Sequence, residues 1–102
     1  MELQSQSVDN AEVLSSHRER IDEIDNQIVE LLNERAKNAL AIGAIKASAN
    51  LPIFSVCREN EVLAKVMELN QGPHSDEQMV DYFMSIMNNS KDIQYNSLKQ
   101  NS

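Results

Sequence analysis

Residues 18–46 read RERIDEIDNQIVELLNERAKNALAIGAIK, and this stretch decides the fold of the chain. It contains no proline, and its apolar residues recur every three or four positions, which places them on one stripe of an α-helix. These residues are Ile21, Ile24, Ile28, Leu31, Leu32, Ala39 and Ile42. Two cations, Arg35 and Lys46, continue the same stripe. Because an unpaired charge in a core is costly, we expect each cation to face an anion or a carboxylate partner.

The helix that carries this stripe is long for a chain of 102 residues. Only Gly43 weakens it between Asn10 and Ala49, at about 1 kcal/mol, so we expect one helix between those limits and a frayed start over residues 1–11. At ~1.5 Å per residue it would span ~55 Å, whereas a domain of this size has a radius of gyration of ~13 Å. Two later helices could not cover its stripe. We therefore predict a partner chain, most simply in a two-fold dimer.

A turn follows this helix and leads into a second one. The sequence Asn-Leu-Pro ends the first helix, because Pro52 disfavours helical geometry at the residue before it. Residues 52–56 should form an extended loop. Ser55 or Cys57 then leads into a helix over RENEVLAKVMELNQ, residues 58–71.

A Gly-Pro turn at residues 72–73 separates the second helix from a third. Ser75 opens the third helix with the capping-box sequence Ser-Asp-Glu-Gln. The polar end YNSLKQNS, residues 95–102, is typical of a frayed tail or the start of a linker. We therefore expect an all-α, three-helix chain that forms one domain over residues 1–102, with a core at about 12–96.

Composition narrows the classes of partner and compartment. The formal charge of −7 weighs against nucleic acid or an anionic membrane as the main partner. Cys57 is the single cysteine, so no intrachain disulfide is possible, and His17 and His74 do not complete a zinc site with it. The N-terminal residues show no signal-peptide pattern, and no apolar run is long enough to cross a membrane. We expect a cytoplasmic protein without a metal.

The candidate site residues are polar side chains at positions where the helical pattern expects apolar ones, or at a helix start. They are Arg18, Arg35, Lys46, Arg58, Ser90 and Gln94, with Glu59 beside Arg58. Each has an ordinary structural explanation. An arginine on a stripe often pairs with a core carboxylate, here Asp22, Asp25 or Glu59, and a lysine near a helix C-terminus favours the dipole. Polar residues late in a helix are commonly solvated.

Their spacing is more informative than each residue alone. Arg35 and Lys46 are eleven residues apart, which returns to nearly the same face after three turns, ~16 Å along the axis. Their side chains could bracket one small dianion. Arg18 lies about 25 Å before Arg35, so the same helix cannot bring both to one small molecule, whereas an antiparallel partner helix could.

Six short motifs in this order resemble the all-helical (type II) class of chorismate mutases over roughly residues 14–95. They are R-x-x-I-D-x-I-D at 18–25, L-L-x-x-R at 31–35, I-G-x-x-K at 42–46, R-E-x-E-V-L at 58–63, G-P at 72–73 and S-x-x-x-Q at 90–94. The resemblance implies an intertwined helical homodimer with two active sites, each of which borrows one arginine from the other chain. It also implies the [3,3] (Claisen) rearrangement of chorismate to prephenate in phenylalanine and tyrosine biosynthesis, without a cofactor.

The resemblance assigns a role to each candidate residue. Arg18 of the partner chain and Arg35 match the clamps on the two substrate carboxylates, and Arg58 matches a supporting cation. Lys46 and Gln94 match the two donors to the ether oxygen. The remaining matches are Glu59, the acceptor for the ring hydroxyl, and Ser90, a nearby polar contact.

One position departs from the family pattern. The family commonly has Asp in the loop before R-E, where it often helps to hold the ring hydroxyl, whereas this chain has Ser55. Either the hydroxyl or backbone N–H of Ser55 takes over this contact, or the contact is weaker here. Two alternatives therefore stay open. An isochorismate-pyruvate lyase shares the architecture and the cationic pocket, although the complete R-E-x-E-V-L and S-x-x-x-Q motifs favour the mutase. A non-catalytic dimeric ligand-sensing domain would retain the fold, and Ser55 is the feature that favours it.

Overall fold

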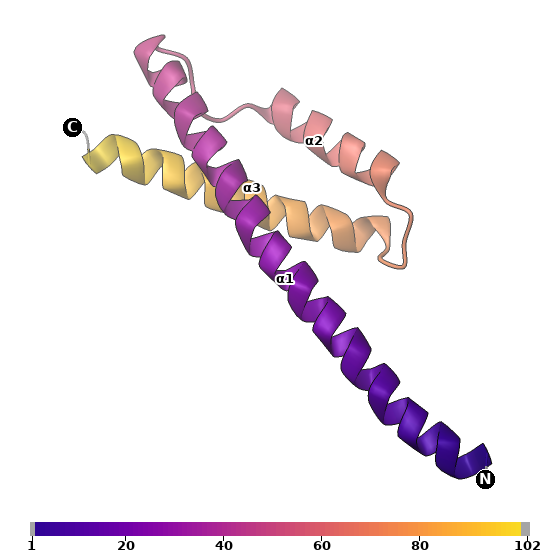
Figure 1. Ribbon diagram of the computed structural model, residues 1–102. Coiled ribbons are helices and arrows are strands. Elements are labelled where there is room, and N and C mark those ends of the chain that lie inside the picture. Colours follow the sequence, from indigo (N-terminus) through magenta and orange to yellow (C-terminus); the bar gives the residue numbers. More distant parts are fainter. Residues whose placement is uncertain (1, 101–102) are drawn as a thin grey trace. The chain divides into compact units, whose positions relative to one another are not determined.

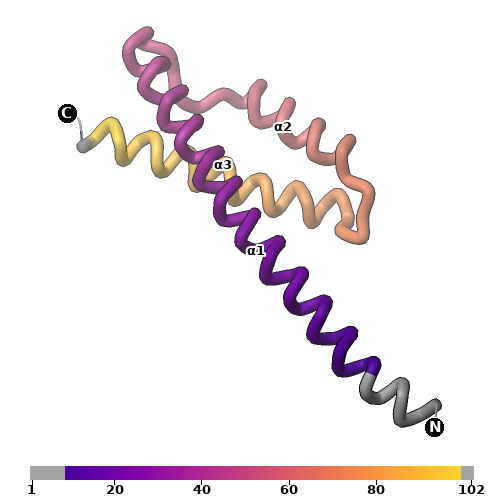
Figure 2. The backbone as a smooth tube through the Cα atoms, viewed as in Figure 1, coloured from indigo at the N-terminus to yellow at the C-terminus, as the bar shows by residue number. Residues whose placement is uncertain are grey.

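The computed structural model describes the backbone of residues 2–100 and the side chains of residues 9–99. These residues form three helices, α1 (Glu2–Ser48), α2 (Val56–Leu69) and α3 (Asp76–Gln100), and contain no strand (Figure 1). Figure 2 follows the same path along the backbone. The predicted all-α, three-helix chain with one very long N-terminal helix is confirmed.

Helix α1 begins earlier than predicted and ends where predicted. It starts at Glu2 rather than near Asn10, because no Pro or Gly interrupts that segment, so the expected fraying of residues 2–11 is wrong for their backbone. Met1 lies outside the described residues. At the other end, Asn50 adopts a left-handed φ of 57°. The N–H of Leu51 donates to the carbonyl of Lys46 at 2.8 Å and that of Asn50 to Ala47 at 3.2 Å, which together form a Schellman motif.

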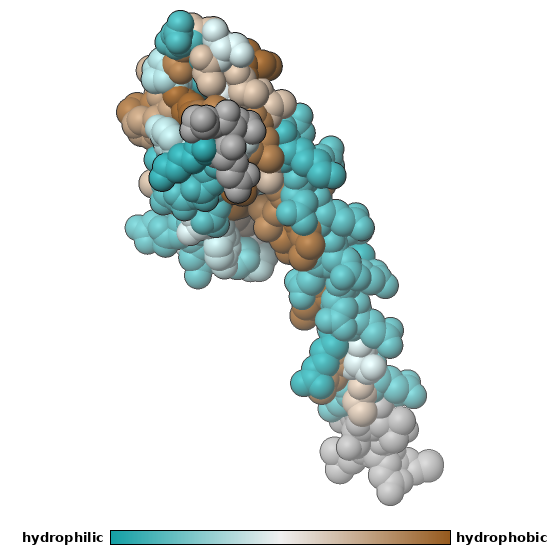
Figure 3. Space-filling model, turned by 90° about the vertical axis from the view of Figure 1, so that its left-hand side faces the viewer, coloured by the Kyte–Doolittle hydropathy of each residue, from teal (hydrophilic) through white to brown (hydrophobic). Residues whose placement is uncertain are grey.

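The chain divides into two compact units, Met1–Glu34 and Arg35–Ser102, and α1 contributes to both. In the first unit every described side chain, from residue 9 to residue 34, is exposed. Large apolar side chains lie among them, as the hydrophobic surface in Figure 3 shows: Val13, Leu14, Ile21, Ile24, Ile28, Val29, Leu31 and Leu32. Within the described residues of the first unit, nothing covers these apolar side chains.

The second unit combines residues 35–48 of α1 with α2 and α3. Helix α2 lies beside α3 and runs in the opposite direction (Figures 1 and 2). Among the described residues, the buried apolar side chains are Val66 of α2, 9% exposed, and Met87 of α3, 6% exposed. This core is small for the amount of apolar surface that the chain carries.

The two shorter helices begin with side-chain caps. The Ser55 hydroxyl accepts the backbone N–H of Arg58 at 3.2 Å, so Ser55 rather than Cys57 is the N-cap of α2. At α3, the N–H of Gln78 donates to the Ser75 hydroxyl at 3.1 Å and the Ser75 N–H to the Gln78 side-chain oxygen at 3.0 Å. This reciprocal pair is the predicted capping box. Gly72, at a φ of 77°, makes the turn between the two helices possible.

Helix α3 is longer than predicted. Residues 95–100 are helical, so the expectation of a frayed polar tail is wrong for them, while residues 101–102 lie outside the description. Leu98 continues the inward face four residues after Gln94 and is half-buried, and Lys99 in the last turn complements the helix dipole. No helix among the described residues is long and apolar enough to cross a membrane.

Candidate active site

A pocket of about 280 Å³ lies in the second unit, between the end of α1, the loop at residues 51–55, the start of α2 and the middle of α3. Seven of the eight predicted site residues line it: Arg35, Lys46, Ser55, Arg58, Glu59, Ser90 and Gln94. The eighth, Arg18, belongs to the first unit and is not part of this pocket.

The charge of the pocket is opposite to that of the chain. Its charged lining residues are the cations Arg35, Lys46, Arg58 and Lys91 and the carboxylate of Glu59. The chain as a whole carries a formal charge of −7. The pocket is therefore locally positive and can attract an anionic ligand, although the chain as a whole is acidic.

Arg35 projects from α1 into the pocket and is held by α3. Its Nη1 donates to the hydroxyl oxygen of Ser90 at 2.9 Å, and that hydroxyl in turn donates to the carbonyl of Ile86 at 3.0 Å. Ser90 thus orients the guanidinium group. A guanidinium has five N–H donors in a planar fork, so the group retains donors for a ligand carboxylate.

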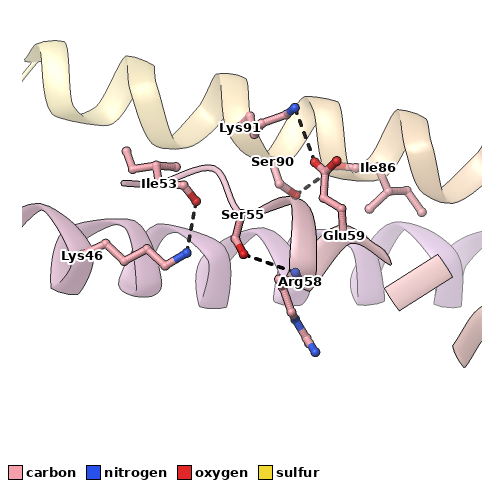
Figure 4. Close-up of polar contacts among 8 residues, drawn as sticks. All are labelled: Lys46, Ile53, Ser55, Arg58, Glu59, Ile86, Ser90 and Lys91. Atoms are coloured by element: carbon pink, nitrogen blue, oxygen red, sulfur yellow. Dashed lines mark hydrogen bonds and ion pairs between the residues drawn. The ribbon is translucent and has the colours of Figure 1, made fainter. Parts of the chain in front are cut away.

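Lys46 is held by the loop that the end of α1 creates. The Schellman motif turns the chain directly after Lys46, and the Lys46 Nζ donates to the carbonyl of Ile53 at 3.1 Å (Figure 4). The side chain is half-buried. Because an ammonium group has three donors, this single bond orients it and leaves donors for a ligand.

Gln94 is the buried polar side chain among the described residues, 9% exposed. Its Nε2 donates to the carbonyl of Ala39 at 2.7 Å, and a primary amide has a second N–H that this bond does not use. Gly43 allows this approach, since a Cβ at that position would lie 3.1 Å from the Gln94 Cγ. A cation and a neutral donor, both held by main-chain carbonyls, thus line the same pocket.

Ser55, Arg58 and Glu59 line the pocket from the start of α2. The Ser55 hydroxyl accepts the cap hydrogen bond described above. Arg58 extends away from Glu59 in Figure 4, and its Nη1 lies 3.3 Å from the Glu61 carboxylate with 71% of the side chain exposed. It therefore lies at the margin of the pocket. The Glu59 side chain is 20% exposed.

Lys91 is a lining residue that was not predicted from the sequence. Its Nζ lies 3.4 Å from the Glu59 Oε2 and 4.2 Å from the centre of the Phe54 ring. The signal was present, because Lys91 follows the core residue Met87 by four and so occupies the inward face of α3. No group of three or more His, Cys, Asp or Glu side chains that could hold a metal ion occurs in the described part of the chain.

The fold and the pocket define the class: an all-helical protein with a cation-lined site for a small anionic ligand. Residues 17–95 match the family described as chorismate mutase type II. The chain therefore belongs to the type II chorismate mutase family.

Individual relatives agree with this family. The chorismate mutase of Methanocaldococcus jannaschii is 30% identical over 90 residues, which cover 87% of this chain and 91% of the relative. A solved structure of chorismate mutase from Thermus thermophilus superposes with a TM-score of 0.79 at 30% identity, covering 80% of this chain and 93% of that one. The bifunctional chorismate mutase/prephenate dehydratase of Neisseria gonorrhoeae is 42% identical over 83 residues, 81% of this chain. The chain spans only 22% of the length of that bifunctional relative.

Proposed function

We propose that this chain is a chorismate mutase, which converts chorismate to prephenate in the biosynthesis of phenylalanine and tyrosine. The observation that supports this best is the meeting of Arg35, Lys46 and Gln94 in one pocket, within the segment that matches the family. The reaction is a unimolecular [3,3] shift, so it needs neither a nucleophile nor a cofactor. Its catalyst must hold a flexible dianion in one shape and stabilise charge on one oxygen.

The first requirement is conformational. The enolpyruvyl group of chorismate has to fold over the ring before the new bond forms, and fixing both carboxylates removes that rotational freedom in advance. Arg35, oriented by Ser90, is suited to one carboxylate because its planar fork can donate twice. Arg18 of a second chain is the clamp that we assign to the other, with Arg58 as a supporting cation at the margin.

The second requirement is electrostatic. As the ether C–O bond breaks, negative charge grows on its oxygen, and donors that are already oriented stabilise it without reorganising. We assign this role to the Nζ of Lys46 and the Nε2 of Gln94, because each has one hydrogen bond to a main-chain carbonyl and further donors available. Glu59 accepts the ring hydroxyl, with Ser55 beside it.

The proposed enzyme is a homodimer in which each chain completes the other's site. The exposed apolar stripe of residues 9–34 supports this, because a second copy of the same helix would bury it. Arg18 lies on this segment, where an intertwined arrangement would carry it to the partner's pocket. On this proposal residues 1–102 form one mutase domain that is complete only as a pair.

The experiment that tests the activity is an ultraviolet assay of chorismate consumption with the product identified, run beside an isochorismate assay. We expect prephenate from chorismate and no pyruvate from isochorismate. Lys46→Ala should lower turnover by two to three orders of magnitude, since losing one such donor costs ~3 to 4 kcal/mol of transition-state stabilisation.

The matched control is Lys37→Ala, which removes an exposed lysine of α1 outside the pocket and should leave turnover unchanged. Near-normal turnover in Lys46→Ala would contradict the role of Lys46. A folded helical protein that converts neither substrate would instead favour a binding or regulatory domain.

A further inference from the structure

Lys91 joins three segments of the second unit around the pocket. It lies on α3 directly after Ser90 (Figure 4). Its ammonium group is 3.4 Å from the Oε2 of Glu59, on the first turn of α2, and 4.2 Å from the ring centre of Phe54, in the preceding loop. None of the roles assigned above uses it.

The Lys91–Glu59 pair differs from the other ion pairs described. Arg20–Glu23 and Arg58–Glu61 each lie within one helical turn and expose more than half of both side chains. Lys91 and Glu59 expose 29% and 20%, and they connect α3 to α2. Ordering two long side chains and partly desolvating them costs free energy. A pair that is nevertheless formed between two helices suggests that its charges have a role at that place.

The role of the positive charge follows from the position of Glu59 in the pocket. A carboxylate that accepts a hydrogen bond from the substrate has to lie beside a dianion, which it would repel if it were not neutralised. Lys91 supplies the neutralising charge and contacts one oxygen, Oε2, so that the other can face the ligand. The Phe54 ring limits the movement of the ammonium group from a second direction through a cation–π contact.

We propose that Lys91 is a positioning residue of this active site: it neutralises the Glu59 carboxylate and sets its orientation toward the ring hydroxyl of the substrate. This inference rests on the proposed mutase function. We assign Lys91 to Glu59 and not to the substrate because the contacts of its ammonium group are with the carboxylate and the Phe54 ring. The double-mutant cycle separates these two roles.

The test is a double-mutant cycle. Lys91→Met keeps the length of the stem and removes the charge, and we expect a roughly tenfold lower kcat/KM, as for residues in direct contact. Most of the loss should appear as a higher KM, because repulsion of the dianion acts on the ground state and the transition state alike. In a Glu59→Gln background the same change should have less than about a twofold effect, and Lys91→Arg should restore most of the activity.

Lys65→Met, at an exposed lysine of α2 outside the pocket, is the matched control and should leave kcat and KM unchanged. Equal losses from Lys91→Met in both backgrounds would mean that Lys91 acts on the substrate directly, and no loss in either would mean that it has no role. Both results overturn the proposal.

A crystal structure of Lys91→Met keeps this inference separate from the proposed function. We expect the Glu59 side chain to leave its observed position there. An unchanged Glu59 overturns the positioning role whether or not the wild-type chain converts chorismate, whereas an inactive wild type with a displaced Glu59 contradicts the mutase function alone.

Discussion

At the scale of single residues, the pocket is organised by main-chain carbonyls as much as by side chains. Ile53 holds the ammonium group of Lys46 and Ala39 holds the amide of Gln94. Neither carbonyl depends on the identity of its own residue, so a sequence cannot reveal these partners. What the sequence does reveal is the conflict between a polar residue and an apolar helical face, and that conflict identified Lys46, Arg35 and Gln94.

Residue-level prediction failed at Lys91 and at Arg58, for two different reasons. The same face rule applied to α3 would have included Lys91, four residues after Met87. Arg58 was a candidate because it lies at a helix start. The sequence predicted its membership of the pocket but not the direction of its side chain, because Glu61 at i+3 attracts the guanidinium group along the helix surface. At the margin of a pocket a side chain can point into the pocket or along the helix surface, and sequence spacing does not decide between these two orientations.

The amide of Gln94 has a consequence for pH. An amide donates without titrating, so we expect a nearly flat wild-type rate between about pH 6 and 8. In Gln94→Glu the new carboxyl can donate only when protonated, and burial raises the pKa of such a group. Its kcat/KM should therefore rise as the pH falls towards 5. Profiles of kcat/KM that run parallel for the two proteins would contradict the donor role of Gln94.

Gly43→Ala tests the close approach of α1 and α3. The added Cβ would lie 3.1 Å from the Gln94 Cγ, so Gln94 must shift by a few tenths of an ångström to accommodate it. We expect kcat to fall roughly three- to tenfold, because small displacements at a reacting group are costly. Helix propensity favours Ala by about 1 kcal/mol, so the Tm should not fall with it. A variant with unchanged kcat would show that the position of Gln94 tolerates this shift.

At the scale of elements, helix ends were predictable where a specific residue makes them. Asn50 and Pro52 end α1, Ser55 starts α2, and the capping box starts α3, all as their sequence signals indicate. At the outer ends of α1 and α3 polarity alone predicts fraying, and there the prediction is wrong. A polar segment without Gly or Pro remains helical when nothing in it favours another conformation.

Ser55 allows the cap of α2 to be separated from the chemistry of the pocket. Ser55→Ala removes the side-chain acceptor for the Arg58 N–H and should cost about 1 kcal/mol, or a few °C in Tm, whereas Ser55→Asp retains a cap and should not. Ser75→Ala is the matched control, since it removes the cap of α3 outside the pocket. Thermal melts and turnover are measured for all three. If Ser55→Ala loses no more activity than Ser75→Ala, Ser55 serves the helix and not the substrate.

At the scale of the whole molecule, the prediction of a second chain followed from length and pattern alone. The stripe that begins with Ile21 was predicted to lack cover from the later helices, and it is exposed throughout the described first unit. The sequence could not identify the molecule that buries this stripe, because an apolar stripe can pack against many partners. The assignment of this role to a second copy of the chain rests on the proposed shared site.

Subunit complementation tests the shared site. Arg18→Ala and Arg35→Ala should each be poorly active as homodimers. A random mixture contains one half heterodimers, each with one intact site of two, so activity should return to about a quarter of the wild-type value. Subunit exchange is verified with two distinguishable tags. Proven exchange without recovery would contradict the assignment of Arg18 to the partner's pocket.

The small core formed by Val66 and Met87 has a thermodynamic consequence. If the proposed dimer forms, a chain that buries so little apolar surface by itself should gain most of its stability from association. Folding and assembly should then be one equilibrium governed by mass action. We expect the Tm to rise by several degrees when the protein concentration increases from about 1 to about 100 µM. A Tm that does not change with protein concentration would mean that the single chain already folds alone. If the Tm does rise with concentration, substitutions on the exposed stripe would change how much of the protein is folded at cellular concentrations without altering the residues of the pocket.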